Sequence, residues 1–129
     1  GLAAIQIGVP KRIIVIDLAK DSEEKKPMYL INPEIISKSN KDATYEEGCL
    51  SVPNQFAEID RPEKCHIKFL DYNGKEQSLD AKGLLATCIQ HEMDHLEGIL
   101  FIDYLSKLKK SMIIKKLSKQ KKSIERIAF

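Results

Sequence analysis

Cysteine is scarce in this chain, and the few that occur show no paired spacing. The 129 residues contain three, an odd number, which disfavours a disulfide framework and favours a reducing compartment. Long apolar runs and a signal-peptide pattern are also absent, so we expect a cytoplasmic protein that has no membrane partner. Internal repeats and low-complexity segments are missing too. With 43% hydrophobic residues, the sequence predicts one folded domain over residues 1–129.

Histidine is equally scarce, yet two of the three histidines lie one helical turn apart. They occur in the segment Gln90–His95, with Glu92 between them. In an α-helix, residues i and i+4 share one face, so His91 and His95 can present two nitrogens to one metal ion. Glu92 can then act as a general base on a water held there, which is the H-E-x-x-H arrangement. The same five residues are also typical of a solvated polar face, and both interpretations stay open at this point.

The residues around the histidine pair favour burial of this helix. Gly98 is predicted to end it. A helix that is apolar on most sides is buried, and an unpaired buried polar group costs about 1–3 kcal/mol. A metal ion would satisfy both histidines and Glu92 at once. The apolar flanking residues are Leu84, Leu85, Cys88, Ile89, Leu96 and Ile99.

A third protein ligand is needed for a catalytic metal site, and no histidine follows His95. The extended protease motif would place a histidine at position 101, where this chain has Phe101. The better candidate is Cys49, in the Gly- and Pro-bounded segment Glu46–Pro53. One thiolate, two imidazoles and a water complete a tetrahedral site, a donor set that suits zinc, nickel, cobalt and ferrous iron.

Three sequence blocks in order resemble the signature of the peptide deformylase family, G-x-G-x-A-A-x-Q, then E-G-C-L-S, then Q-H-E-x-D-H. They stand here as Gly1–Gln6, Glu47–Ser51 and Gln90–His95, and the resemblance extends from Gly1 to about Leu108. The first block begins at its second glycine, so we expect a fragment that lacks the family's N-terminal region. Phe56 stands where many bacterial members carry a basic residue.

The resemblance implies a metallo-hydrolase that removes the N-formyl group from the N-terminal methionine of newly made proteins and releases formate. It implies one divalent ion, Fe²⁺ in the cell, which Zn²⁺, Ni²⁺ or Co²⁺ can replace. Cys49, His91 and His95 would be the ligands. Glu92 would move the proton, while the Gln6 side-chain amide and the backbone N–H of Leu50 would stabilise the oxyanion.

Helical spacing also predicts where the methionine side chain binds. Positions 84, 87 and 88 precede His91 by seven, four and three residues, so their side chains share its face and form a mainly apolar slot. The family resemblance adds Gly1 of the first block, Gly48 of the second block, and Tyr45, which lies two residues before the second block. The expected substrate-binding residues are Gly1, Tyr45, Gly48, Leu84, Thr87 and Cys88.

Two charged residues are candidates for supporting the cysteine segment. We expect Glu47 to pair with Arg61 and so to fix the loop that presents Cys49. The alternative is that both are solvated surface charges, whose pairing contributes about 0–1 kcal/mol.

The remaining sequence predicts strands and turns, and therefore an α+β fold in which antiparallel strands pack around one central metal-binding helix. A strong hairpin signal is Asn73-Gly74. His66 is expected to be an exposed strand residue, with Cys65 beside it as a small buried side chain. The predicted strands are Lys11–Asp17, Met28–Ile36 with an interruption at Asn32-Pro33, Lys64–Leu70 and Lys75–Leu79.

The C-terminal segment concentrates positive charge. Residues 104–129 carry nine Lys or Arg and one acid, a net charge of +8, whereas the preceding 103 residues carry −6. The segment predicts a basic amphipathic helix, either packed on the domain with a solvated lysine face or docked on ribosomal RNA and protein. The expected contacts are Lys115, Lys116, Lys119, Lys121 and Lys122. Its apolar positions are Leu105, Leu108, Met112, Ile113, Leu117, Ile124 and Ile127.

Two other functions compete with deformylation. One is an H-E-x-x-H endopeptidase, against which Cys49 and the missing downstream ligand argue. The other is a non-catalytic ribosome-binding fragment, against which the complete set of ligands and Glu92 argues. For deformylation, as for these two alternatives, we expect a monomer.

Overall fold

The computed structural model describes residues 1–20 and 23–127, with side chains only as far as Lys121. Its contacts divide the chain into two compact units. The first unit comprises Gly1–Tyr45 and Asp60–Ile99, and the second comprises Glu46–Ile59 and Leu100–Phe129. The expectation of one domain over residues 1–129 stays a prediction.

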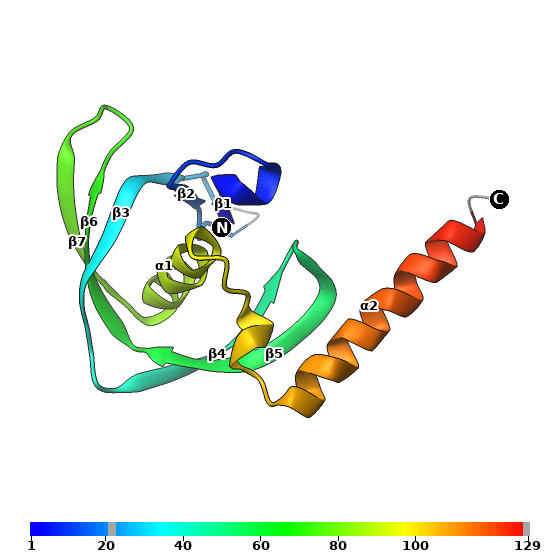
Figure 1. Cartoon of the computed structure of the whole chain (residues 1–129). Coiled ribbons are helices and arrows are strands. Elements are labelled where there is room, and N and C mark those ends of the chain that lie inside the picture. The colour runs from blue at the N-terminus through cyan, green and yellow to red at the C-terminus, as the bar shows by residue number, and fades with distance from the viewer. Residues whose placement is uncertain (21–22, 128–129) are drawn as a thin grey trace. The chain divides into compact units, whose positions relative to one another are not determined.

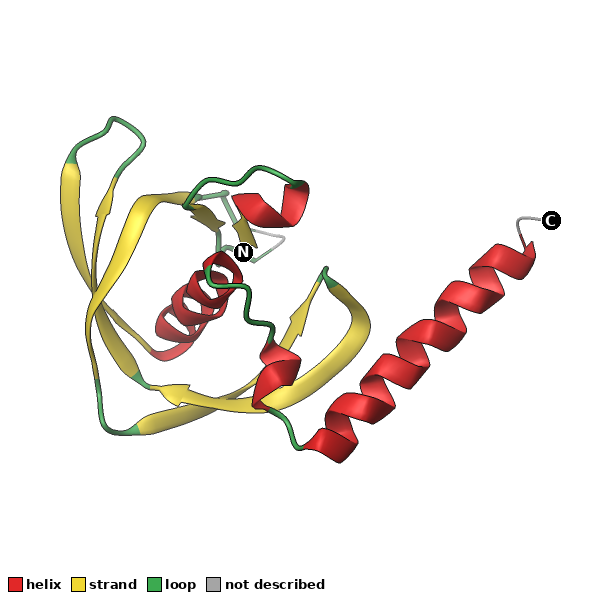
Figure 2. Ribbon diagram, in the orientation of Figure 1, coloured by secondary structure: helices red, strands yellow, loops and turns green. Residues whose placement is uncertain are grey.

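Strands dominate the first two thirds of the chain and helices the last third (Figure 2). In chain order the elements are β1 (Leu2–Ala3), the 3-10 helix η1 (Ala4–Ile7), β2 (Ile13–Ile16), β3 (Met28–Lys38), β4 (Asp42–Cys49), β5 (Val52–Pro62), β6 (Lys64–Leu70), β7 (Glu76–Lys82), α1 (Gly83–Leu96), the 3-10 helix η2 (Phe101–Tyr104) and α2 (Lys107–Ile127).

The first unit contains an antiparallel sheet of five strands in the order β1-β2-β3-β6-β7. In Figure 1 the strands β3, β6 and β7 curve around α1. Alternate residues of the strands face the helix, as expected for a sheet with one buried face. Ile14, Leu30 and Ile67 pack there with Ala86 and Ile89 of α1, all fully buried. The predicted α+β fold, with antiparallel strands around a central helix, is confirmed.

The predicted interruption of β3 at Asn32-Pro33 is wrong, because the strand runs from Met28 to Lys38. The irregularity is a bulge instead. The pairing register with β6 shifts between Ile31 and Glu34, and Asn32 takes a φ of 49°. Asparagine tolerates this left-handed conformation, and a bulge accommodates a proline that cannot donate a backbone hydrogen bond.

The hairpin around Asn73-Gly74 is confirmed. Gly74 has a φ of 78° and its N–H donates to the carbonyl of Asp71 at 2.9 Å, which closes the turn between β6 and β7. His66 lies on β6 as predicted. It is half-buried rather than exposed, because its Nδ1 lies 2.6 Å from the Asp80 carboxylate on β7.

The strands β4 and β5 were not predicted. They pair with each other as a two-stranded sheet, and the boundaries between the two units fall within them. Most of their side chains are exposed or half-buried, so the apolar alternation that marks a strand on a core is weak.

The second unit has its own apolar core. Its most buried members are Val52 and Ile59 of β5, Phe101 and Ile102 of η2, and Ile113 of α2. Cys49 packs against this cluster.

The basic helix begins at Lys107, three residues later than predicted, because Tyr104 ends η2. The Ser106 hydroxyl accepts the N–H of Lys109 at 3.3 Å and so caps α2. Only part of the predicted apolar face is packed, since Leu108 is 72% and Met112 is 51% exposed. The side chains of Ile124 and Ile127 lie outside the described residues. No helix in the described part of the chain is long and apolar enough to cross a membrane.

Candidate active site

Helix α1 carries the candidate active-site residues and has well-defined ends. It begins at Gly83, which has a φ of 62°, and ends beyond Leu96, where Gly98 takes a φ of 73°. The N–H of Gly98 donates to the carbonyl of His95 at 3.1 Å, as expected for the predicted terminating glycine.

The polar residues of the motif are buried, which overturns the interpretation of a solvated face. His91, Glu92 and His95 are only 8%, 4% and 6% exposed. The flank is less buried than predicted at both ends, since Leu84 is 49% and Ile99 is 36% exposed.

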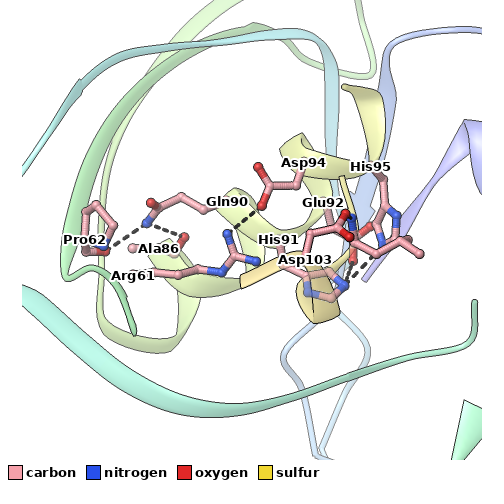
Figure 3. Close-up of polar contacts among 10 residues, drawn as sticks. Arg61, Pro62, Ala86, Gln90, His91, Glu92, Asp94, His95 and Asp103 are labelled. Carbon is pink, nitrogen blue, oxygen red and sulfur yellow. Dashed lines mark hydrogen bonds and ion pairs between the residues drawn. The ribbon is translucent and has the colours of Figure 1, made fainter. Parts of the chain in front are cut away.

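The two histidines face each other across one turn of α1 (Figure 3). Their Nε2 atoms are 3.2 Å apart, and their rings meet edge to face. Burial lowers the pKa of His95, and the charge of His91 lowers it further, so the neutral imidazole is favoured. Two nitrogens bound about 2.0–2.1 Å from one tetrahedral ion lie about 3.4 Å apart. The pair therefore fits two positions of a metal site.

Glu92 lies beside this pair. Its Oε1 is 3.9 Å from the Nε2 of His91, while its Oε2 is buried without a hydrogen-bond partner among the described residues. Burial raises the pKa of Glu92, against the opposing effect of His91. A buried carboxyl group with an unpartnered oxygen is costly and therefore typical of a functional site.

Two further buried contacts hold α1 in place (Figure 3). The Arg61 Nη1 lies 2.7 Å from the Asp94 carboxylate, and their side chains are 4% and 18% exposed. The Gln90 Nε2 donates to the carbonyls of Pro62 at 2.9 Å and Ala86 at 3.1 Å. Together they fix the rotation of α1 against the segment at residues 61 and 62, and with it the direction of the histidines.

Glu47 and Arg61 are 6% and 3% exposed, which excludes the alternative that both are solvated surface charges. Their mutual pairing stays a prediction. The contact of Arg61 with Asp94 was missed, because 33 residues separate the two and nothing local in the sequence connects them. The sequence did indicate that a partner was needed, because Gln90 and Asp94 are polar residues in a helix that was predicted to be buried.

Gln6 and Gly1 belong to the first unit. The Gln6 Oε1 accepts the N–H of Ala3 at 2.8 Å, which orients the side-chain amide. Gly1 lies against Glu92, since a Cβ built on Gly1 would stand 2.9 Å from the Glu92 Oε1. Among the expected pocket residues, Tyr45 approaches the start of α1, where its hydroxyl would be 3.5 Å from a Cβ on Gly83.

The other expected pocket residues of α1 differ in exposure. Thr87 is 3% exposed, and its hydroxyl has no hydrogen-bond partner among the residues that the structure describes. Cys88 is half-buried and packs against the core, whereas Leu84 is half exposed.

Gly48, Cys49 and Leu50 belong to the second unit, at the end of β4 and in the turn that follows. Cys49 is half-buried, and the Leu50 side chain is 83% exposed. Phe56 covers Gly48 so closely that a Cβ on this glycine would come within 2.4 Å of the ring. The structure thus brings His91, Glu92, His95 and Gly1 together in the first unit.

Replacing Arg61 by methionine is expected to lower the free energy of unfolding by about 3 kcal/mol, because Asp94 would keep a mostly buried charge without its cation. Urea unfolding measures the change. Lys41→Met is the matched control, since Lys41 forms a 3.7 Å pair with Glu63 while 82% exposed. That change should cost no more than about 1 kcal/mol. Equal effects of the two substitutions would show that the Arg61 contact is not stabilising.

A helix that buries two facing imidazoles and a carboxylate inside an antiparallel sheet is the framework of a metal-dependent hydrolase. Residues 1–111 match the family model for polypeptide deformylase. The chain is 72% identical over 121 residues to a peptide deformylase of Pelagibacter ubique (strain HTCC1062), covering 94% of this chain and 70% of the relative. The chain belongs to the polypeptide deformylase family.

Solved structures agree with this assignment. The crystal structure of a peptide deformylase from Ehrlichia chaffeensis superposes with a TM-score of 0.87 at 42% identity, covering 95% of this chain and 73% of that one. A peptide deformylase from Legionella pneumophila gives a TM-score of 0.85 at 46% identity, with coverages of 97% and 72%. The predicted family and the hydrolase class are confirmed, and neither competing function is supported.

Proposed function

We propose that this chain removes the N-formyl group from the N-terminal methionine of newly made proteins and releases formate, in the cytoplasm and as a monomer. The observation that carries the proposal is the pair of imidazole nitrogens 3.2 Å apart beside the buried Glu92, in a member of a family of metal-dependent deformylases.

We assign the metal ligands to the Nε2 atoms of His91 and His95 and to the Sγ of Cys49. A thiolate with two imidazoles is a borderline donor set, which suits ferrous iron in the cell and accepts Zn²⁺, Ni²⁺ or Co²⁺ in its place. When bound, the ion acts as a Lewis acid and lowers the pKa of its bound water far below that of bulk water, to about 7.

Glu92 is the proposed proton carrier. Its carboxylate takes a proton from the attacking water, whose oxygen forms the new bond to the formyl carbon. When the carbon–nitrogen bond breaks, Glu92 returns that proton to the departing amine, so formate and a free methionine N-terminus result. Burial supports this role, because it raises the pKa of Glu92 toward the pH at which both transfers run.

Gln6 and Leu50 are the proposed oxyanion donors. The bond from the Ala3 N–H to the Gln6 Oε1 turns the amide so that its nitrogen is directed away from Ala3. The backbone N–H of Leu50 directly follows the proposed ligand Cys49 in sequence. One donor of this kind typically contributes about 3–4 kcal/mol to the transition state.

The methionine side chain is assigned to the slot predicted from the helical spacing of α1. Its apolar character suits an unbranched thioether, and it discriminates against a side chain shorter by one methylene by only about 1–3 kcal/mol. The assigned residues are Gly1, Tyr45, Gly48, Leu84, Thr87 and Cys88.

Formate release distinguishes this activity from its rivals. Wild-type protein loaded with metal should release formate from formyl-Met-Ala and leave an N-acetylated peptide with several internal bonds intact. Cleavage of the internal bonds would indicate an endopeptidase. Metal binding without either reaction would indicate a non-catalytic fragment.

We also propose that the lysine face of α2 binds ribosomes through phosphate contacts. Lys115, Lys116, Lys119 and Lys121 are exposed, and the side chain of Lys122 lies outside the described residues. Docking at the ribosome would raise the local concentration of formylated chains.

Reversing the charge of these five lysines is expected to weaken co-sedimentation with ribosomes by about tenfold or more at low salt and to flatten its salt dependence. Reversal of Lys11, Lys20, Lys25, Lys26 and Lys75, which lie outside α2, is the matched control for net charge. Normal ribosome binding by the reversed helix would identify α2 as a structural helix with a solvated face.

A further inference from the structure

Three lysines meet at one end of the five-stranded sheet, within the first unit. Lys38 is the last residue of β3, Lys64 is the first residue of β6, and Lys82 is the last residue of β7. Because neighbouring strands of this sheet run antiparallel, these strand ends lie side by side (Figure 1). All three lysines are exposed and line one cavity of about 460 Å³. The other polar residues of the lining are Ser37, Ser39, His66 and Asp80.

The charges of these three lysines are not neutralised within the described part of the chain, where none of them has a carboxylate within 4.0 Å. The two acids next to them in sequence have other partners. The Glu63 carboxylate lies 3.7 Å from the Nζ of Lys41. The Asp80 carboxylate lies 2.6 Å from the Nδ1 of His66. The cavity therefore keeps an excess of positive charge.

Two of the lysines repel each other. Lys64 and Lys82 stand directly opposite in the pairing of β6 with β7. Opposed residues of an antiparallel pair lie about 4.5–5.5 Å apart at their Cα atoms, and like charges there are destabilising. A local cost that the fold does not compensate is typical of a functional position, and an anion bound between the two side chains would remove it.

Ser39 fixes the backbone at this end of the sheet. Its N–H donates to the carbonyl of Lys64 at 2.9 Å, and its hydroxyl accepts the Lys64 N–H at 3.0 Å. The same hydroxyl donates to the carbonyl of Lys41 at 2.9 Å. The backbone that carries the lysines is therefore held in place, while their long side chains can adjust to a ligand.

We propose that this cavity binds the phosphate groups of RNA, as a contact separate from the lysine face of α2 and independent of deformylation. Three lysines and one aspartate give the lining a net charge of +2. Neighbouring strands are about 4.8 Å apart, so the lysines spread over roughly 10 Å, which suits a strand with several phosphates. Lysines act on phosphate as point charges, and the lining has no arginine fork to select one small phosphorylated molecule. Such contacts position a nucleic acid without reading its sequence.

Binding of a labelled oligouridine to the full chain tests the inference. The triple substitution Lys38→Gln, Lys64→Gln and Lys82→Gln should weaken binding about tenfold at low salt. Loss of three phosphate contacts should also flatten the plot of log K against log salt concentration by about 2. In amide NMR spectra of the wild type, oligouridine should shift the signals of residues 37–39, 64–66 and 80–82. The absence of shifts there would refute the site.

The matched control is the triple substitution Lys11→Gln, Lys20→Gln and Lys75→Gln. It removes the same charge from exposed residues of the same unit that do not line the cavity. An equal loss of affinity and of salt dependence in both triple variants would show that net charge alone attracts RNA, and would refute the cavity.

Two other anions distinguish the source of the bound charge. Polyglutamate that binds as tightly as oligouridine, and that loses the same affinity on the cavity substitutions, would assign the cavity to acidic proteins. Inorganic phosphate that binds as tightly as oligouridine would assign it to a small anion. Either result would refute an RNA site.

A stability measurement separates a binding role from a structural one. Lys82→Gln alone should not lower the free energy of unfolding in urea, because it removes one of two opposed positive charges. A marked loss of stability in this variant would identify Lys82 as a structural residue and would contradict the proposal.

Discussion

Replacing any one of Cys49, His91 and His95 by alanine is expected to remove most of the bound metal and, with it, deformylation. Three protein ligands and one open position make up a catalytic site of this type, so two remaining ligands hold the ion far more weakly. The metal-to-protein ratio of each purified variant measures the first effect, and formate release from formyl-Met-Ala measures the second.

Cys65→Ala is the matched control for the loss of a thiol. Cys65 is 4% exposed in the core of the first unit, and burial raises the pKa of its thiol, which disfavours the thiolate that a metal needs. This variant should keep its metal. Stoichiometric metal in Cys49→Ala would refute the three-ligand assignment while leaving the histidine pair as a partial site.

Replacing Glu92 by alanine is expected to keep both metal and fold but to lower kcat by at least roughly 10²–10⁴-fold, the usual contribution of general acid–base catalysis. The fold should survive, because one oxygen of this carboxylate is buried without a partner among the described residues, and its removal relieves a cost. Steady-state kinetics and the metal content of the same preparation separate the two effects.

Glu97→Gln is the control on the same stretch of chain. Glu97 pairs with Arg12 at 2.9 Å while its side chain is 62% exposed, and it follows the motif by two residues. Its turnover should match that of the wild type. A Glu92→Ala enzyme with near-normal kcat would mean that another group moves the proton.

Sequence patterns correctly predicted those structural features that depend only on residues close together in the chain. The histidine spacing, the terminating Gly98 and the turn at Asn73-Gly74 each depend on a few neighbouring residues, and each occurs where it was expected. The β4–β5 pair was missed because a two-stranded ribbon with mostly accessible side chains needs no regular apolar alternation. A bulge likewise absorbed the proline that was expected to interrupt β3.

The candidate site likewise has a part that local sequence spacing predicts and a part that depends on the tertiary fold. The grouping of His91, Glu92 and His95 follows from their spacing on one helix, and all three are buried, while their chemical roles stay a prediction. The contact between Arg61 and Asp94 depends on the tertiary fold, so the hydrophobic periodicity of the sequence could not predict it. Cys49 came from the chemistry of a missing ligand together with the family resemblance, and its role stays a prediction for the metal analysis.

Because Gly1 lies close to Glu92, substitutions of Gly1 are expected to affect catalytic turnover more than the amount of folded protein. Any side chain there brings a carbon to 2.9 Å from the Glu92 Oε1, and the flexible end of Glu92 can swing aside to make room. The backbone need not move, so the folded protein would accumulate at normal levels. Position 1 would thus look tolerant in a screen that counts abundance and intolerant in one that selects for turnover.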